Sequence, residues 1–212
     1  GGDWSSDVCS SDLLGLYLAQ LNKKLFSGQI KDILADLGAI PGKIEEILAG
    51  KDQVKELARS MADATSVLFL GRNVGYPVAM EGALKLKELA YIHAEGFAAG
   101  ELKHGPIALI DDGQPVFVVM PSPLDRHSLH AKVVSNIQEV RARGARTFAV
   151  AERGDAAVRG QAEVVFEVPE TQPMLMPLLT TVPLQIFALE LATAKGYDVD
   201  QPRNLAKSVT VE

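Results

Sequence analysis

The 212-residue sequence predicts an α/β fold, with a parallel sheet flanked by helices and preceded by a helical segment. Short runs of β-branched and aromatic residues, bounded by glycine or proline, are typical of buried strands. Longer segments with apolar residues at helical spacing separate these runs, and such alternation favours a parallel sheet with helices on both faces. A composition of 47% apolar and 23% charged residues is ordinary for a globular domain.

The elements follow in order along the chain. Helical spacing predicts segments at 14–26, 30–37 and 44–48, which Gly38 and Pro41 interrupt, and a further helix at 52–62. Strands are expected at 65–70, 115–120, 146–150 and 163–168. Helices are expected at 77–91, 129–143 and 174–194, the first of them opened by a proline in its first turn.

Residues 1–13 differ in composition from the rest. They contain the only Trp and the only Cys of the chain, four serines and three acids. We interpret them as a foreign or processing segment, such as a translated adapter, and expect them to be extended or poorly ordered. The alternative is a reactive thiol at Cys9, although no histidine lies nearby in the sequence to activate it.

Charge and cysteine content exclude several classes of protein. A net charge of -6 argues against general binding of nucleic acid or anionic membrane. No uninterrupted apolar run of about 18 residues suggests a membrane span, and the N-terminus lacks the pattern of a secretory signal. One cysteine permits no internal disulfide, and the histidines have no partners at metal-ligand spacing. We expect a cytoplasmic protein without a metal or cofactor.

Two segments carry groups that could do chemistry. In the predicted helix 77–91, Glu81, Lys85 and Glu88 lie three or four residues apart and share one face. They are either a solvated ion pair or a base and an ammonium group for proton transfer at carbon. The tight loop 100–106 presents Glu101, Lys103 and His104, which are either surface charges and a capping residue or catalytic groups.

Other positions give weaker signals. The loop 71–76 follows a predicted strand, where ligands often bind, but it matches neither a dinucleotide fingerprint nor a P-loop. An anion at the start of the following helix is only weakly indicated. His93, His127 and His130 are expected to be structural or exposed, and a lysine in a polar tail, such as Lys207, usually has no function.

Taken together, YPVAMEGALKLKELAYIHAEGFAAGELKHGP and the terminal DVDQPRNLAKSVTVE closely resemble the glucosamine-6-phosphate synthases, the isomerising glutamine–fructose-6-phosphate transaminases. The likeness runs from about residue 14 to 212. It implies a sugar-isomerase (SIS) fold of the flavodoxin-like or Rossmann-like kind. Residues 51–197 would be the second SIS domain, 14–50 a helical remnant of the first with its linker, and 198–212 a catalytic tail.

The resemblance also implies roles for single residues. Lys207 would form a Schiff base with open-chain fructose 6-phosphate, and Glu88 would move a proton between C1 and C2 on the way to glucosamine 6-phosphate. Lys85 would stabilise the enolamine oxygen or tune the base. His104 would open the sugar ring of the neighbouring subunit in a cytosolic homodimer. The expected substrate-binding residues are Arg203, Asn204 and Ala206.

The departures from the family matter as well. No glutaminase domain is present, nor the first SIS domain with the Ser-x-Ser-Gly-x-Thr type of loop that holds the sugar phosphate. We therefore expect the chain alone to be inactive. Two alternatives stay open: a sugar-phosphate-sensing SIS domain of a regulator, although no helix-turn-helix precedes it, and a SIS-type deglycase or isomerase without glutaminase. The tail sequence favours the synthase over the latter.

Overall fold

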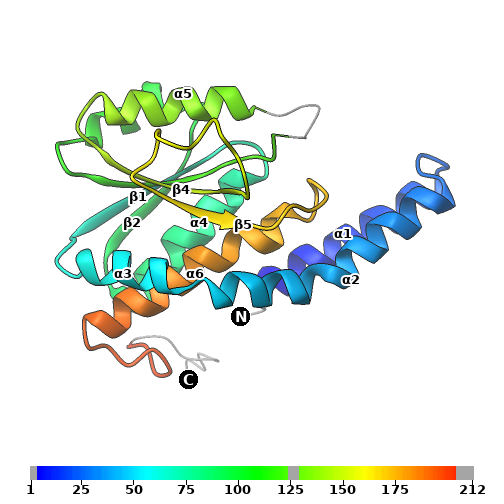
Figure 1. Ribbon diagram of the computed structural model, residues 1–212, viewed down its shortest axis with the longest axis horizontal. Coiled ribbons are helices and arrows are strands. Elements are labelled where there is room, and N and C mark those ends of the chain that lie inside the picture. The colour runs from blue at the N-terminus through cyan, green and yellow to red at the C-terminus, as the bar shows by residue number, and fades with distance from the viewer. Residues whose placement is uncertain (1–3, 124–128, 204–212) are drawn as a thin grey trace, which may run out of the picture.

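The computed structural model describes residues 4–123 and 129–203. Its centre is a five-stranded parallel sheet in the order β2-β1-β3-β4-β5 (Figure 1). The predicted fold class, a parallel sheet with helices on both faces, is confirmed, whereas the sequence predicted only four of these strands and not their order. The strands are β1 (Ser66–Gly71), β2 (His93–Ala98), β3 (Pro115–Val119), β4 (Arg146–Glu152) and β5 (Val164–Val168). Since β2 and β3 lie on opposite sides of β1, the strand order reverses between β1 and β3.

Helices cover both faces of the sheet (Figure 1). The helix α5 packs on one face, while α3, α4 and α6 pack on the other. The α-helices are α1 (Trp4–Leu21), α2 (Ser27–Ala49), α3 (Asp52–Ser60), α4 (Gly75–Lys85), α5 (His130–Arg141) and α6 (Met176–Ala194). A π-helix (Leu86–Ala90) extends α4, and 3₁₀ turns lie at Leu102–His104 and Pro106–Leu109.

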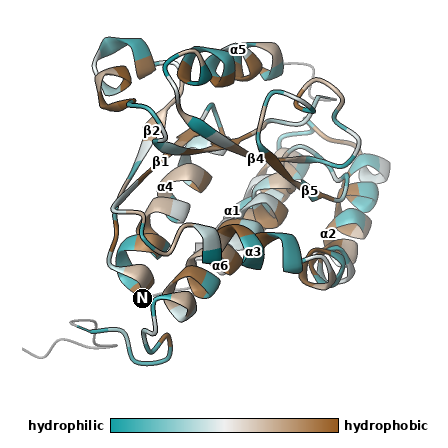
Figure 2. Ribbon diagram, turned by 60° about the vertical axis from the view of Figure 1, so that its left-hand side comes forward, coloured by the Kyte–Doolittle hydropathy of each residue, from teal (hydrophilic) through white to brown (hydrophobic). Residues whose placement is uncertain are grey.

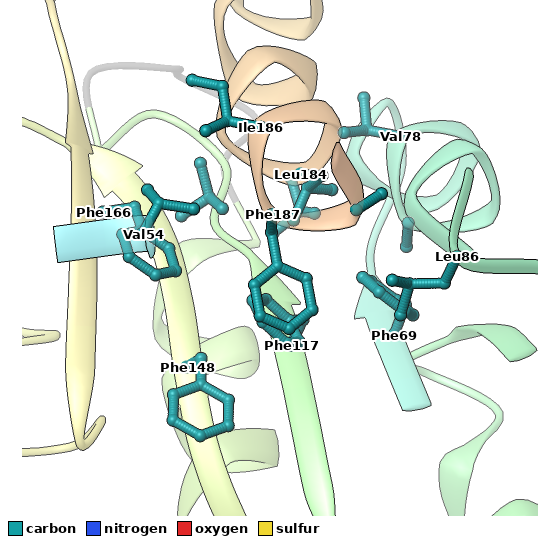
Figure 3. Close-up of a cluster of buried hydrophobic side chains, with 14 of the residues drawn as sticks. Val54, Phe69, Val78, Leu86, Phe117, Phe148, Phe166, Leu184, Ile186 and Phe187 are labelled. Carbon is teal, nitrogen blue, oxygen red and sulfur yellow. The ribbon is translucent and has the colours of Figure 1, made fainter. Parts of the chain in front are cut away.

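The larger core lies between the sheet and α6. The ring of Phe117 lies 5.1 Å from that of Phe69, 5.1 Å from that of Phe148 and 4.6 Å from that of Phe187, all measured between centroids (Figure 3). Phe187 comes from α6, so this helix closes the core over three strands. In Figure 2 the hydrophobic colour is strong on β4 and β5, which lie between the helices.

The helix α6 is long and apolar enough to cross a membrane by length and composition. It is the one described helix of which this is true, and 72% of its most apolar window is buried inside the protein. Burial on nearly all sides explains the composition, because a helix that is hydrophobic all round needs apolar neighbours on every side. The helix is therefore a core element of this fold.

Our expectation for residues 1–13 is wrong from Trp4 onward, because the chain there is helical and continuous with the helix that ends at Leu21. Helix continuity needs only local hydrogen bonds, so it does not require the segment to be native. Asp12 fits its position poorly: burial raises the pKa of its carboxyl, and Oδ2 has no hydrogen-bond partner. The foreign origin of the segment stays a prediction.

Two further elements differ from the sequence-based expectation. The breaks expected near Gly38 and Pro41 do not occur, because α2 continues through Pro41 while Ile30, Ile40 and Ile47 are buried. Burial of these side chains outweighs the backbone hydrogen bond that a proline removes. The strand β2 was not expected. It is an edge strand with one fully buried position, Ala94, so it carries no apolar run.

Candidate functional site

Lys85 forms the centre of a charged cluster at the end of α4. Its Nζ lies 2.7 Å from Oε2 of Glu88 and 3.6 Å from Oε1 of Glu81. The Glu81 side chain is 6% exposed, whereas Lys85 and Glu88 are 29% and 28% exposed. The predicted shared face is therefore real. It is partly open, so a ligand can reach the Lys85–Glu88 pair.

The cluster straddles the change from α-helix to π-helix. The N–H of Tyr91 donates to the carbonyl of Leu86, five residues back, which widens the turn that carries Glu88. Short π-helical turns inside α-helices often lie at functional sites. Sequence spacing of charges could not reveal this turn, since the 100° rule assumes a regular helix.

Lys85 is held as an ammonium group. Partial burial alone lowers its pKa, but the hydrogen bond with Glu88 and the negative charges of Glu81 and Glu88 outweigh that effect. The net pKa of Lys85 is raised. A lysine that attacks a carbonyl needs a neutral amine, which a lowered pKa provides. Lys85 is thus suited to stabilising negative charge and unsuited to forming an imine.

The start of the tail contacts the residue that follows the helix of this cluster. The backbone N–H of Arg203 donates to the hydroxyl of Tyr91 at 2.8 Å, and the guanidinium carbon lies 4.0 Å from the centre of the Tyr91 ring. Tyr91 follows the π-helix directly. Asn204, Ala206 and Lys207 lie outside the described residues. The structure thus brings Arg203 to the helix of Lys85 and Glu88.

His104 lies on a separate loop that is firmly attached to the core. Leu102 is fully buried, while Lys103 forms an ion pair with Glu139 of α5 at 2.8 Å. The side chain of His104 is exposed. Asn136, which is buried, accepts from Arg72 at 3.2 Å and donates to Glu139 at 3.3 Å, so it links this ion pair to the end of β1.

Within one chain, Glu88 precedes and His104 follows the edge strand β2, so they lie toward opposite ends of that strand. Glu88 comes five residues before β2 begins at His93, and His104 comes six residues after β2 ends at Ala98. A six-residue strand spans roughly 16 Å.

A small pocket lies where the strand order reverses, at the carboxyl ends of β1 and β3. It is lined by Arg72, Asn73, Gly75 and Ser122 among others. Behind it Ser122 donates to Glu152 at 2.8 Å, and His130 lies 2.6 Å from Asp155. This is the usual ligand crevice of open α/β sheets. Lys85 and Glu88, however, are at the other end of α4.

Two of the described histidines have acidic partners that sequence spacing did not reveal. His93 lies 2.9 Å from Glu95, and His130 pairs with Asp155, 25 residues away. His127 is outside the described residues. Across residues 4–123 and 129–203, no group of three His, Cys, Asp or Glu side chains could hold a metal ion.

The comparisons with known proteins agree with this architecture. The SIS domain model matches residues 60–195. The chain is 64% identical over 207 residues to the glutamine--fructose-6-phosphate aminotransferase [isomerizing] of Corynebacterium efficiens, covering 98% of this chain and 33% of that protein. The chain therefore spans about a third of the length of this curated relative.

Solved structures show the same arrangement. The C-terminal domain of glucosamine-fructose-6-phosphate aminotransferase from Francisella tularensis matches with a TM-score of 0.81 and 36% identity, over 90% of this chain and 52% of that chain. A tagatose-6-phosphate ketose/aldose isomerase from Escherichia coli matches with a TM-score of 0.66 and 22% identity, over 76% and 44%. The second likeness shows the fold alone. The family model covers most of the described sheet and its helices, and the chain belongs to the SIS domain family.

Proposed function

We propose that this chain is the part of an isomerising glutamine–fructose-6-phosphate aminotransferase that carries out sugar isomerisation. The observation that carries the proposal is the cluster of Lys85, Glu81 and Glu88. The tail segment begins against Tyr91, which follows the helix of this cluster. The 64% identity to an enzyme of that name supports the substrate, fructose 6-phosphate, and the product, glucosamine 6-phosphate.

In the proposed chemistry, the neutral amine of Lys207 attacks the C2 carbonyl of the open-chain sugar and water leaves. The protonated imine makes the C1 hydrogen acidic, because it accepts the electrons of the broken C–H bond. Ammonia displaces Lys207 from the imine, which frees the lysine amine and leaves the product nitrogen on C2. Glu88 removes the C1 proton of this imine to give an enolamine and returns a proton at C2. The ammonium group of Lys85, 2.7 Å from Glu88, stabilises the oxygen on C1.

The remaining roles follow from the placement of the loops. His104 opens the sugar ring in the partner of a homodimer, which the roughly 16 Å length of β2 between His104 and Glu88 supports. Asn204 and Ala206 contact the sugar, and Arg203 lies at the entry to this segment. The glutaminase, the phosphate site and the nitrogen source belong to other parts of a longer cytoplasmic enzyme. No metal or cofactor takes part.

Trapping the imine tests this proposal. The chain spans about a third of the Corynebacterium efficiens enzyme, so in the test it replaces the matching third of that enzyme in a chimera. Borohydride reduction with fructose 6-phosphate should add a hexitol phosphate to the peptide containing Lys207. Lys207→Arg should lose the adduct, since a guanidinium is not a usable nucleophile. Lys87→Arg is the matched control, because Lys87 is exposed next to Glu88.

The role of Glu88 is tested in the same chimera. Glu88→Gln should still allow the imine to be trapped, but exchange of the C1 hydrogen with solvent should fall by about 10²–10⁴-fold, the usual contribution of a general base. An adduct on Lys85 or Lys103 would contradict the assignment of Lys207. Exchange at the normal rate in Glu88→Gln would exclude Glu88 as the base.

The alternatives have weaker support. A sugar-phosphate isomerase without glutaminase, such as the one from Escherichia coli, shares the fold at 22% identity. A regulatory SIS domain would bind sugar phosphate without forming an adduct. An adduct on Lys207 and dependence on glutamine in the chimera distinguish the aminotransferase from both.

A further inference from the structure

Tyr91 has an unusual backbone conformation. Its φ of 54° lies in the left-handed region, which among the described non-glycine residues only Lys23 and Asn73 share. For a bulky aromatic residue this conformation is an outlier, which persists only when surrounding contacts hold it in place. It also ends the π-helix that carries Glu88, so two irregular features of the backbone coincide at this position.

The contacts that compensate come from the far end of the chain. The Tyr91 hydroxyl accepts the backbone N–H of Arg203, and its ring lies under the Arg203 guanidinium. The ring of Tyr197, which follows α6, lies 4.8 Å from that of Tyr91. The half-buried side chain of Tyr91 therefore contacts both Tyr197 and Arg203. Arg203 lies 112 residues after Tyr91 in the sequence.

These contacts lie at the surface. Arg203 and Tyr197 are exposed, and Tyr91 is absent from both buried clusters of the core. A purely structural role is therefore a poor explanation for a strained tyrosine, since removing a surface contact changes the stability of a domain little. The contact between Tyr91 and Arg203 does fix the position of Arg203, where the tail begins.

Fixing Arg203 limits where Lys207 can go. Four residues separate them, and an extended chain covers at most about 14 Å over that length. Without the contact, the nearest described anchor is Val199, which packs against the larger core and lies eight residues before Lys207. Doubling the free length lowers the local concentration of the amine about threefold, since it falls as the −3/2 power of length.

Resting on the proposed function, we propose that Tyr91 is a positioning residue that clasps Arg203 and so holds the lysine tail beside Glu88. Tyr91 touches no reacting atom in this scheme. Tyr91 instead connects the helix that carries the proposed base, Glu88, to the tail that carries the proposed nucleophile, Lys207. Arg203 then acts through its backbone and its stacked guanidinium, which leaves Asn204 and Ala206 as the sugar contacts.

Limited trypsin digestion of the 212-residue chain tests the clasp without any catalysis. Trypsin must take the Arg203 side chain into its own pocket, so the guanidinium has to leave the Tyr91 ring. Cleavage after Arg203 should be about tenfold faster in Tyr91→Ala, which loses a hydrogen bond and a cation–π contact, and intermediate in Tyr91→Phe, which keeps the ring.

Cleavage at a distant site in the same digestion serves as the internal control. Lys23 and Lys24 lie in the exposed turn between α1 and α2, so cleavage there should be equal in all variants. Tyr17→Ala is the matched control, because Tyr17 is 58% exposed on α1. Equal cleavage after Arg203 in the unmodified chain and in Tyr91→Ala would overturn the clasp. Faster cleavage at every site in Tyr91→Ala would show that this variant unfolds. In that case Tyr91→Phe tests the clasp, which is refuted if cleavage after Arg203 in Tyr91→Phe equals that in the unmodified chain.

The chimera tests the consequence for chemistry. Tyr91→Ala should slow borohydride-trapped imine formation on Lys207 about threefold, with Tyr91→Phe recovering part of the rate. Exchange of the C1 hydrogen per imine formed should be unchanged, because Glu88 is intact. Unchanged imine formation in Tyr91→Ala would refute positioning. Absence of any adduct in the unmodified chimera would refute the proposed function, while the trypsin result would still decide the clasp.

Discussion

At the scale of single residues, Glu152 is a buried carboxylate at the end of β4. Burial raises the pKa of its carboxyl, a hydrogen bond from Ser122 and the nearby His130 lower it, and the charges of Glu170 and Asp155 raise it further. The net pKa is raised. The folded state therefore binds this proton more tightly than the unfolded state, and the charged form of Glu152 costs stability.

We predict that Glu152→Gln stabilises the protein at pH 7 by ~1 kcal/mol, because the amide keeps an acceptor for Ser122 and removes the buried charge. The gain should vanish as pH falls below the ordinary glutamate range, where Glu152 is protonated in both states. Urea unfolding at pH 7 and at about pH 3 measures the difference. A loss of stability at pH 7 would contradict the prediction.

Glu163→Gln is the control with the opposite sign. The hydrogen bonds and charge of Arg146 lower the pKa of Glu163, so this pair contributes stability above the ordinary glutamate range that is lost as pH falls. Both side chains are partly exposed, so the loss at pH 7 should be within about 1 kcal/mol.

At the scale of elements, a glycine sets how closely α4 approaches β2. A Cβ on Gly96 would lie 2.8 Å from the Cα and 2.9 Å from the N of Met80. These are backbone atoms, so α4 itself would have to move, and with it Lys85. No side chain larger than hydrogen fits there.

We predict that Gly96→Ala destabilises the protein by ~1–3 kcal/mol, the usual cost of overpacking. Gly38→Ala is the matched control, because Gly38 lies within α2 with no atom within 4 Å of the added methyl group. It should gain ~0.5–1 kcal/mol from reduced backbone freedom. Thermal unfolding of both variants measures this, and equal effects would contradict the close approach.

Sequence patterns predicted most elements, because four of the five strands are buried runs and the helices have periodic apolar residues. They missed β2, since an edge strand containing Gly96 needs few apolar residues. They predicted correctly that Glu81, Lys85 and Glu88 share a face, because the helix alone determines which side chains three or four residues apart lie together. They missed the contact of Tyr91 with Arg203 and that of Asn136 with Arg72, because long-range pairs depend on the folded chain.

At the scale of the whole molecule, α1 and α2 carry many apolar side chains that nothing in the described chain covers. Tyr17 and Leu21 are 58% and 60% exposed, and Phe26 is 77% exposed. Exposed apolar surface of this extent promotes association. In a longer enzyme such side chains can pack against another part of the chain.

We predict that residues 14–212 alone do not interconvert fructose 6-phosphate and glucose 6-phosphate or form glucosamine 6-phosphate from ammonia. Orientation by a remote phosphate can supply roughly 7–11 kcal/mol of a barrier, and the resemblance to the synthases implies a phosphate site outside these residues. Coupled enzyme assays measure turnover. Turnover similar to that of the chimera would contradict this and would make the pocket beside Arg72 the first candidate for the phosphate.

We predict that the protein of residues 14–212 self-associates in sedimentation experiments, because its exposed apolar side chains can pack against a second copy. A variant with Leu21→Gln and Phe26→Gln should associate less, because it removes two of the exposed side chains. Leu34→Gln alone, at 46% exposure, should have a smaller effect. A monomer at all concentrations would contradict the prediction.

The position of α6 has a consequence for the order of folding. The helix supplies Phe187 to the core against β3. Lys195 at its end donates to the carbonyl of Ala62, 133 residues earlier, in the turn that follows α3. Contacts this distant in sequence require a large loop to close before they stabilise anything, which slows folding. Until α6 arrives, this face of the sheet is only partly covered, and the apolar surface of β3 that Phe187 packs against is exposed to association with other chains during synthesis.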